Sequence, residues 1–389
     1  MDILKIGFHL IGDDAWRVGT IYLEDLFLSL REEYGACLDL CFLVNTTEQS
    51  IPIELRQATD QVLAYSPPRR WTRLWLIDRA AKRLFARDLL GEFFLRQNQI
   101  RAIVFGEAPS GSTIPTLGWI PDFQHVHLPD LFSAAERQSR NAEYLKIAER
   151  STRVILLSEF VRKDFQILFP KNASKARVVS PVSFIPGSAY DDAPELQNDR
   201  YHLPRKFIYL PNQFWRHKNH RLAFHALKIL KERGSDVFLV CSGFPGDYRH
   251  LTYFADLLQE LSCWNVRDRV AFLGLLPRND VLRLMRESVC VLNPSLFEGY
   301  GMTVEEARSL GKRLVLSDIP AHREQNPPQA VFFDPHSCED LAEKLRRVWN
   351  EKSPGPDREL EAEARSSLPG RITQYARSFM SVIQEVVVE

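Results

Sequence analysis

The chain has 389 residues, of which 45% are hydrophobic and 26% are charged, and 50 basic residues balance 50 acidic ones. This length suggests two domains, and the composition is typical of a soluble globular protein. The balanced charge provides no overall positive field, which argues against a nucleic-acid partner. Neither a signal peptide nor an apolar run of the ~20 residues that a membrane-spanning helix needs is apparent, so we expect a cytoplasmic location.

Short apolar runs alternate with amphipathic stretches along the whole chain, which is the pattern of βαβ units and parallel sheets. The strands expected in the first half are residues 3–10, 39–44, 102–105, 118–121 and 154–157. Those expected in the second half are residues 207–210, 237–242, 270–273, 289–293 and 313–317. Helices are expected between them, for example at residues 221–232, 248–261, 279–287 and 303–310. The sequence therefore predicts an α/β protein with parallel sheets.

Residues 67–87 combine basic and apolar side chains. Seven Lys and Arg residues alternate there with Trp71, Trp75, Leu76 and Phe85. The pattern predicts a basic amphipathic helix, whose apolar face packs either in an ordinary core or against an anionic membrane or a lipid-pyrophosphate acceptor. Both interpretations stay open, with residues 69–87 as the candidate for peripheral contact with the inner face of the plasma membrane.

A stretch rich in Pro, Asp and small residues lies near the middle of the chain, within residues 181–204. Such a composition is typical of an interdomain linker. We therefore expect an N-terminal domain of residues 1–185, a linker of residues 186–203 and a C-terminal domain of residues 204–370. The amphipathic tail, residues 371–389, is expected to pack as a closing helix.

The segment from Pro294 to Gly311 follows a predicted buried strand and leads through a glycine-rich turn into a helix. Ligands of open α/β sheets bind at such positions, outside the carboxyl ends of the strands. The backbone amides of Gly301, Met302 and Thr303 would lie at the helix N-terminus, a suitable site for a phosphate group.

Two carboxylates frame this turn. Glu298 lies in the turn and Glu306 lies eight residues later, in the helix. One carboxylate can accept hydrogen bonds from sugar hydroxyls and the other from a ribose diol. Alternatively, Glu298 caps the helix and Glu306 is an ordinary solvated helical residue.

At this point the sequence resembles a known family. The run Ser-Leu-Phe-Glu-Gly-Tyr-Gly-Met-Thr-Val-Glu-Glu-Ala, residues 295–307, is similar to the E-x7-E motif of retaining GT4 glycosyltransferases, and the similarity continues through residues 311–324 to 332–335. The resemblance implies the GT-B fold, in which two Rossmann-like, doubly wound parallel-sheet domains face a central cleft. It also implies that Glu298 contacts the sugar of a nucleotide-sugar donor, that Glu306 contacts the ribose, and that Glu305 points elsewhere.

A second patch, residues 209–220, is aromatic and basic and follows another predicted strand. Basic groups there can neutralise a diphosphate leaving group without a metal ion. The family usually has an Arg and a Lys six residues apart in this position. Here Lys218 matches the Lys, whereas Asn212 occupies the Arg position, so we expect Arg216 to compensate unless this patch is only a basic surface loop.

Other donor-side positions follow from the resemblance. Gly274 and Leu275 follow a predicted strand where backbone groups of the family meet the nucleobase, and Gly243 resembles another donor-site glycine or is a simple turn. Since recognition through backbone groups leaves little trace in the side-chain sequence, the sequence does not identify the nucleobase.

The N-terminal half contains residues 119–133, where family members place a histidine near the reacting centre. Either His125 or His127 matches, and we favour His125, with Asp122 as its polar partner and His127 on the acceptor side. Gly12 lies in the expected acceptor loop after the first strand, but this loop lacks adjacent glycines. Since no third ligand accompanies the two histidines and no C-x-x-C pair occurs, we expect no metal or other cofactor.

The resemblance thus implies a metal-independent hexosyltransferase that uses a UDP-sugar such as UDP-glucose, or GDP-mannose next, and a saccharide or lipid-linked saccharide acceptor in bacterial polysaccharide biosynthesis. The acceptor would bind the N-terminal domain and the donor the C-terminal domain, with the tail helix crossing back to the first. Two alternatives are a catalytically silent nucleotide-sugar-binding subunit and a nucleotide-sugar epimerase or hydrolase.

Overall fold

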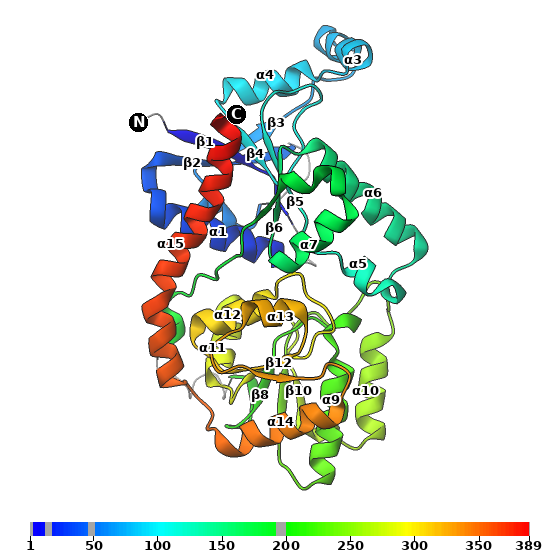
Figure 1. The fold of residues 1–389 in the computed structure, drawn as a ribbon, viewed down its shortest axis with the longest axis vertical. Coiled ribbons are helices and arrows are strands. Elements are labelled where there is room, and N and C mark those ends of the chain that lie inside the picture. The colour runs from blue at the N-terminus through cyan, green and yellow to red at the C-terminus, as the bar shows by residue number, and fades with distance from the viewer. Residues whose placement is uncertain (1–2, 12–17, 46–50, 192–199, 389) are drawn as a thin grey trace. The chain divides into compact units, whose positions relative to one another are not determined.

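The computed structural model describes residues 3–11, 18–45, 51–191 and 200–388. The chain forms two compact units (Figure 1). Unit 1 comprises residues 1–121, 138–181 and 371–389, and unit 2 comprises residues 122–137 and 182–370. Among the described residues, no helix is both long and apolar enough to cross a lipid bilayer.

Unit 1 is built on a seven-stranded parallel sheet with the order β3-β2-β1-β4-β5-β6-β7. Its strands are β1 (Leu4–Phe8), β2 (Leu38–Asn45), β3 (Gln61–Tyr65), β4 (Ala102–Val104), β5 (Thr116–Trp119), β6 (Arg153–Leu156) and β7 (Ala176–Val178). Its helices are α1 (Val18–Tyr34), α2 (Ile53–Ala58), α3 (Arg73–Phe85), α4 (Leu89–Gln97) and α7 (Glu159–Leu168), while α6 (Ala134–Arg150) begins in unit 2 and continues here. The central strands are apolar and buried because helices cover both faces of the sheet.

Unit 2 repeats this winding in a six-stranded parallel sheet with the order β10-β9-β8-β11-β12-β13. The strands are β8 (Ile208–Leu210), β9 (Leu239–Cys241), β10 (Val270–Phe272), β11 (Val291–Asn293), β12 (Leu314–Ser317) and β13 (Val331–Phe333). The helices are α5 (Gln124–His127), α9 (His220–Glu232), α10 (Tyr253–Cys263), α11 (Arg278–Glu287), α12 (Met302–Leu310), α13 (Pro320–Gln325) and α14 (Cys338–Glu351). Helices α9 and α14 pack side by side against the sheet, where Leu227 and Leu345 belong to one buried cluster (Figure 1).

These sheets confirm the predicted α/β class with two parallel, doubly wound sheets. All ten predicted strands are present, with shifts of one or two residues at their ends. Three strands were not predicted, namely β3, β7 and β13, and each lies at an edge of its sheet. An edge strand is covered less completely, so its apolar pattern is weaker; in β3 the side chains alternate between half-buried and exposed.

The last helix, α15 (Arg358–Val388), begins well before the predicted start at residue 371 and contains Pro369. Its second part belongs to unit 1, where Phe379 stacks on Phe8 and Glu385 pairs with Arg153 and Arg177. Of the expected linker, residues 186–203, the structure describes 186–191, with a short 3-10 helix at Gly187–Tyr190, and 200–203.

Candidate functional site

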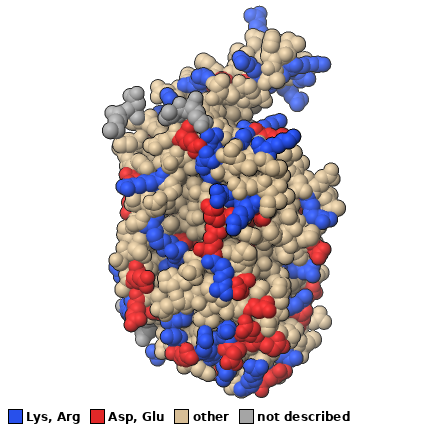
Figure 2. Space-filling view, in the orientation of Figure 1, with Lys and Arg blue, Asp and Glu red and all other residues tan. Residues whose placement is uncertain are grey.

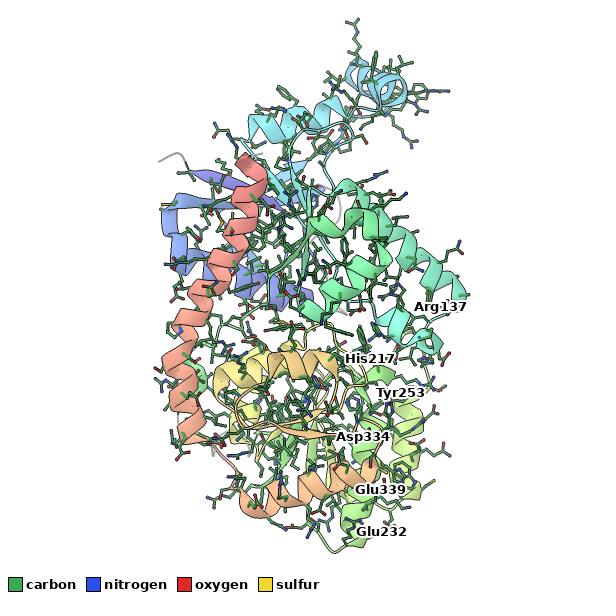
Figure 3. The ribbon with its side chains drawn as sticks, in the orientation of Figure 1. Arg137, His217, Glu232, Tyr253, Asp334 and Glu339 are labelled. Atoms are coloured by element: carbon green, nitrogen blue, oxygen red, sulfur yellow. The ribbon has the colours of Figure 1, made fainter. Side chains whose placement is uncertain are left out.

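The winding of unit 2 creates one place where neighbouring loops diverge. Strands β8 and β11 lie side by side in the centre of the sheet. From β8 the chain continues to β9 and β10 on one side, whereas from β11 it continues to β12 and β13 on the other side. Ligands of open α/β sheets bind at such a switch point, outside the carboxyl ends of the strands. Residues 211–219 follow β8 and residues 294–301 follow β11, so two segments far apart in the sequence meet there. The backbone N–H of Leu296 donates to the carbonyl oxygen of His217, labelled in Figure 3, at 2.8 Å.

An ion pair joins the two loops. The Lys218 Nζ lies 2.6 Å from the Glu298 Oε1, and the Ser295 hydroxyl donates to the same oxygen at 2.7 Å. Both side chains are largely buried, with 19% and 11% of their surfaces exposed. Burial raises the pKa of Glu298, but the positive charge of Lys218 and the hydrogen bonds outweigh it, so this pKa lies below its ordinary value. The site therefore contains a fixed carboxylate beside a fixed ammonium group.

Asn212 lies at the base of the site and is buried. Its amide nitrogen donates to the Asn293 Oδ1 at 3.2 Å, and its amide oxygen accepts from the Thr303 hydroxyl at 3.3 Å. The residue thus links β11 to the first turn of α12. An uncharged side chain held in this way contributes orientation, but no positive charge.

Helix α12 begins next to the hydrogen bonds of Asn212, one of which comes from Thr303 in its first turn. Gly301 precedes it with φ of +99°, a conformation that side chains other than glycine rarely adopt, and turns the chain into the helix. The amides of Met302 and Thr303 belong to the first helical turn, where N–H groups have no acceptor within the helix. Together with Lys218, this end of α12 favours a negatively charged group.

Glu306 lies one turn into α12 and is buried. The Arg278 Nε, from the start of α11, lies 3.4 Å from its Oε1. The neighbouring Glu305 is fully buried, and it accepts hydrogen bonds from Tyr300 and Ser309. The two adjacent glutamates therefore have different surroundings, one with a cation and one with hydroxyl groups.

The loops after β9 and β10 are joined through the backbone. The N–H of Gly243 donates to the carbonyl oxygen of Gly274 at 2.8 Å. A Cβ at Gly243 would lie 2.5 Å from the carbonyl oxygen of Asn212, so only glycine fits without a shift of the backbone. Leu275 follows and is half exposed. These contacts connect the region expected for the nucleobase to the base of the site.

The structure adds His322, which the sequence did not single out. It lies fully buried on α13, and its Nδ1 is 2.9 Å from the carbonyl oxygen of Ser317. Burial lowers its pKa, and the negative charge of Glu298 partly opposes this. His322 lies far from both loops in the sequence, so no local pattern linked it to them. Its approach to Glu298 depends on the adjacency of β11 and β12.

Comparison with known proteins groups the region around this switch point with a known family. Residues 196–367 match the model of the family described as "Glycosyl transferases group 1". The matched region contains both loops of the switch point and all of α12. The resemblance to this family is thus confirmed over these residues.

The relatives support the same grouping. The chain is 26% identical over 171 residues to an uncharacterized glycosyltransferase, YqgM, of Bacillus subtilis, covering 44% of this chain and 43% of YqgM. It is 24% identical over 222 residues to the serotype-specific mannosyltransferase WbdA of Escherichia coli, covering 57% of this chain and 24% of WbdA. The matches thus span less than half the length of either curated relative.

A solved structure shows the fold over nearly the whole chain. Alr3699/HepE of Anabaena, crystallised with UDP and glucose, superposes with a TM-score of 0.67 at 16% identity and covers 97% of this chain and 99% of its own. This agreement confirms the GT-B-like architecture that the E-x7-E motif implied.

The histidine segment belongs to unit 2. Residues 122–137 lie inside the expected N-terminal domain in sequence, but they pack with unit 2. Arg249 explains this attachment: its guanidinium pairs with Asp247 at 3.2 Å, donates to the Gln124 Oε1 at 3.1 Å and lies over the Phe132 ring. A single buried cation thus holds the segment at two points, Gln124 and Phe132.

The two histidines of this segment lie in different surroundings. His125 is 2% exposed and its ring meets Phe132 edge to face. His127 is exposed, and its ring stacks on Phe297, which directly precedes Glu298, with centroids 5.0 Å apart. Asp122 accepts a hydrogen bond from the backbone N–H of Gln124 and so shapes the turn before α5.

Two expected positions complete the account. The side chain of Arg216 is exposed, while its backbone N–H donates to Asp247. Gly12 lies outside the described residues. Within the part of the chain that the structure describes, no group of three or more His, Cys, Asp and Glu side chains is arranged to hold a metal ion.

Proposed function

We propose that this chain is a retaining hexosyltransferase that needs no metal ion or other cofactor. It moves a sugar from a nucleoside-diphosphate donor to a saccharide or lipid-linked saccharide acceptor. The observation that carries the proposal is the Lys218–Glu298 pair at the switch point of unit 2, beside the first turn of α12. The pair offers a cation for phosphate and a carboxylate for sugar hydroxyls within one small region.

The proposed roles combine the resemblance with the positions of the residues in unit 2. Lys218 and the amides of Met302 and Thr303 bind the diphosphate, Glu306 accepts hydrogen bonds from the ribose, and Glu298 orients the sugar. The loops that contain Gly243, Gly274 and Leu275 receive the nucleobase, and Arg216 and Asn212 support the phosphates.

The reaction exchanges one bond at the anomeric carbon. The acceptor hydroxyl oxygen bonds to that carbon on the face from which the phosphate leaves, the carbon–oxygen bond to the diphosphate breaks, and the hydroxyl proton passes to the leaving phosphate oxygen. Charge develops on the diphosphate, where Lys218 and the start of α12 stabilise it. His125 is the proposed contact at the reacting centre, with Asp122, His127 and Gly12 on the acceptor side.

For the donor we propose a UDP-sugar first, such as UDP-glucose, and GDP-mannose second. HepE binds UDP and glucose, and WbdA is a mannosyltransferase. Bacterial polysaccharide biosynthesis in the cytoplasm, at the inner face of the plasma membrane, is the proposed setting.

One observation favours a second candidate, a nucleotide-sugar-binding subunit without turnover. Asn212 occupies a position where the family usually has an arginine, and its amide is used in structural hydrogen bonds. Such a protein would bind the donor but transfer nothing.

The test is calorimetric binding of UDP, GDP and ADP, first without metal and then with Mg²⁺, followed by product analysis with and without acceptor. We expect metal-independent binding of one nucleotide. Lys218→Met and Glu306→Ala each remove a charge-assisted contact worth ~1.5–3 kcal/mol, so binding should weaken roughly tenfold to a hundredfold.

Glu305→Gln is the matched control, since it changes the adjacent glutamate, and it should bind as the wild type does. No binding, or binding that requires Mg²⁺, contradicts the proposed donor site. Binding without transfer to any acceptor supports the silent subunit, and conversion of the donor without an acceptor supports a hydrolase or epimerase.

A further inference from the structure

His322 has a ring nitrogen that lacks a hydrogen-bond partner among the described residues. The side chain lies on α13 and is fully buried. Its Nδ1 is 2.9 Å from the carbonyl oxygen of Ser317, and a carbonyl oxygen only accepts, so Nδ1 carries the hydrogen in the neutral ring. The lone pair is then on Nε2, which is buried and makes no hydrogen bond. Since most buried polar atoms in proteins are hydrogen-bonded, this lone pair requires an explanation.

The unpaired side of the ring faces the start of α12. The ring carbon bonded to Nε2, Cδ2, would lie 3.7 Å from a Cβ on Gly301, the residue that precedes α12. Gln325, one turn further along α13, approaches the same glycine. Its amide nitrogen donates to the carbonyl oxygen of Gly301 at 3.3 Å, and its Oε1 is buried. Within the described chain, both the His322 Nε2 and the Gln325 Oε1 thus lack a donor at the turn where the proposed diphosphate binds.

The charges around His322 oppose one another. Burial lowers its pKa the most, the negative charge of Glu298 opposes this, and the positive charge of Lys218 adds to it. The pKa therefore lies below the ordinary 6.5, and the ring is neutral at neutral pH. Other charged side chains of the packed helices α12 and α13 make contacts of their own: Glu305 with Tyr300 and Ser309, Arg308 with the backbone of Gln325, and Arg323 with Asp318.

Positive charge is limited at this end of the sheet. Asn212, in the position where the resemblance expects an arginine, contributes none. The Lys218 Nζ lies 2.6 Å from the Glu298 Oε1, so its charge is already balanced, and the side chain of Arg216 is exposed. Figure 2 shows acidic and basic side chains interspersed over the visible face of the molecule, so that surface provides no field of one sign. The negative charge of a bound diphosphate would therefore lack a full counter-charge.

We propose that His322 is the second cation of the donor site and takes up a proton from solvent when the diphosphate binds. The diphosphate attracts the Lys218 ammonium group, which leaves Glu298 with less counter-charge, and it adds negative charge at the start of α12. Both changes favour the imidazolium form of His322. The proton bonds to the Nε2 lone pair, the unpaired Gln325 Oε1 lies at the same turn to accept from the new N–H, and the proton returns to solvent when the nucleoside diphosphate leaves. This inference rests on the proposed function, since the diphosphate causes the uptake.

A neutral His322 could instead accept a hydrogen bond from a hydroxyl group of the donor sugar. The ring is fully buried, so a hydroxyl group would have to displace part of the turn to reach Nε2, whereas a proton needs no such room. The proton also supplies the charge that Asn212 does not. The two possibilities differ in how donor binding depends on pH.

The test is calorimetric binding of UDP-glucose and GDP-mannose from about pH 5.5 to about pH 8, in pairs of buffers with different ionisation enthalpies. The phosphates of these donors are diesters that do not titrate in this range, so any proton uptake belongs to the protein. Since the ring is neutral in the free protein and protonated in the complex, affinity should rise as the pH falls, by up to about tenfold per pH unit. The binding enthalpy should change with the buffer as expected for the uptake of up to about one proton.

His322→Asn is the test variant. An amide nitrogen can keep the hydrogen bond to the Ser317 carbonyl oxygen, but the side chain cannot be protonated. We expect its affinity to match that of the wild type within a few-fold at about pH 8, and both the rise at low pH and the proton uptake to be lost. His225→Asn is the control, because His225 is half-buried on α9 in the same unit and stacks on Trp264. Its substitution should leave both quantities unchanged.

Three results would overturn the inference: donor binding without proton uptake in the wild type, the same uptake in His322→Asn, or an affinity that this variant lowers by the same factor at every pH. The last result would assign Nε2 to a sugar hydroxyl group. If His322→Asn does not fold, NMR titration of the wild type still decides, because one of the ten histidines should show a pKa that rises on donor binding. Neither donor binding at any pH is a different result, which contradicts the proposed donor site itself and the inference with it.

Discussion

At the switch point of unit 2, β8 and β11 lead into loops that contain Lys218 and Glu298. At the corresponding point of unit 1, β1 and β4 lead into His9 and Phe105. The His9 ring lies against the backbone of Gly106, and burial lowers its pKa. The ring of Phe105 packs near Tyr22 and Trp119. The same winding thus ends in a charged pair in one unit and, among the described residues, in aromatic rings and a largely neutral histidine in the other.

The difference shows which properties the winding determines. Parallel order and the switch point determine where a ligand can approach each sheet, because the loops diverge there. The loop residues determine the kind of ligand. Unit 2 suits an anionic ligand, whereas the described loops of unit 1 offer no comparable cation at that position.

The largest expected effect comes from breaking the charged pair of unit 2. Glu298→Gln keeps the size of the side chain but removes its charge, so Lys218 loses its counter-charge and, under the proposed function, the donor sugar loses a charged hydrogen-bond acceptor. We expect turnover to fall by about 10²–10³-fold, the scale for one lost electrostatic contact in an active site. The measurement is initial rates of sugar transfer with the donor identified by calorimetry.

Glu305→Gln again serves as the control, because it makes the same substitution at a nearby glutamate, on α12. Glu305 accepts hydrogen bonds from Tyr300 and Ser309, and its substitution should leave turnover within a few-fold of the wild type. Equal losses in both variants would mean that the fold of α12, rather than the charge of Glu298, supports the activity.

A smaller effect should follow from releasing the histidine segment from unit 2. Arg249→Met keeps the bulk of the side chain but removes the pair with Asp247 and the hydrogen bond to Gln124. We expect turnover to fall about tenfold while nucleotide affinity stays unchanged, since misplaced catalytic groups affect the reaction more than binding. Steady-state kinetics and calorimetry measure the two quantities separately.

Arg221→Met, which removes an exposed pair with Glu260 in the same unit, is the comparison variant and should change neither quantity. If Arg249→Met weakens nucleotide binding as much as turnover, the guanidinium supports the donor loops themselves and does not position the histidines.

In unit 1, a charged cluster should affect stability alone. Glu385 on α15 pairs with Arg153 and Arg177, and these hydrogen bonds lower its pKa from 4.5 to about 2. Since the folded state has the lower pKa, this stabilisation is fully present above about pH 4.5 and is lost as the pH falls through about 2. Glu385→Gln should cost about 1–2 kcal/mol at neutral pH, after allowance for solvent screening, and less as the solution is acidified.

Chemical unfolding at a series of pH values measures this difference. Glu159→Gln, which breaks an exposed pair within α7, is the control and should cost less than about 0.5 kcal/mol. A Glu385→Gln variant whose stability deficit stays constant down to pH 2 would show that the carboxylate charge is not the stabilising factor.

The smallest expected effect concerns Asn212. Asn212→Ala removes its contacts to Asn293 and Thr303, each a neutral hydrogen bond worth ~1 kcal/mol. We expect nucleotide affinity to fall by several-fold, less than for Lys218→Met, because no charge is lost. A loss as large as that of Lys218→Met, measured by the same calorimetry, would make Asn212 a direct ligand of the phosphates.

Much of the fold could be predicted from the sequence. Buried central strands such as β4 and β11 are continuous apolar runs, so period and length suffice to find them. The edge strands β3, β7 and β13 were not predicted. Each lacks a neighbouring strand on one side, so fewer of its positions are apolar and its pattern is weaker. The start of α15 was predicted thirteen residues too late, since the polar sequence before residue 371 shows a weak apolar stripe and contains Pro369.

The candidate site divides in the same way. Glu298, Gly301 and Glu306 lie within one motif, and the resemblance of this motif to that of a known family selected the two glutamates, which spacing alone left open. The contacts between Lys218 and Glu298, 80 residues apart, required the adjacency of β8 and β11. Two features depend on side chains from distant segments: the attachment of residues 122–137 to unit 2 and the burial of His322. Neither the hydrophobic period nor the spacing of residues in the sequence predicts such contacts.

The sequence by itself determined the α/β class, the central strands, the glycine turn before α12 and the resemblance of residues 196–367 to the glycosyl transferases group 1 family. These features depend on backbone preferences and on patterns that repeat over short distances. Only the tertiary structure decided that Glu298 is held by Lys218 and that Arg249 attaches the histidine segment to unit 2. It also decided that the large apolar side chains of α3, such as Leu84 and Phe85, are exposed. The physical reason is that burial and ion pairing depend on which segments the sheets bring together, and that choice is made by the whole chain at once.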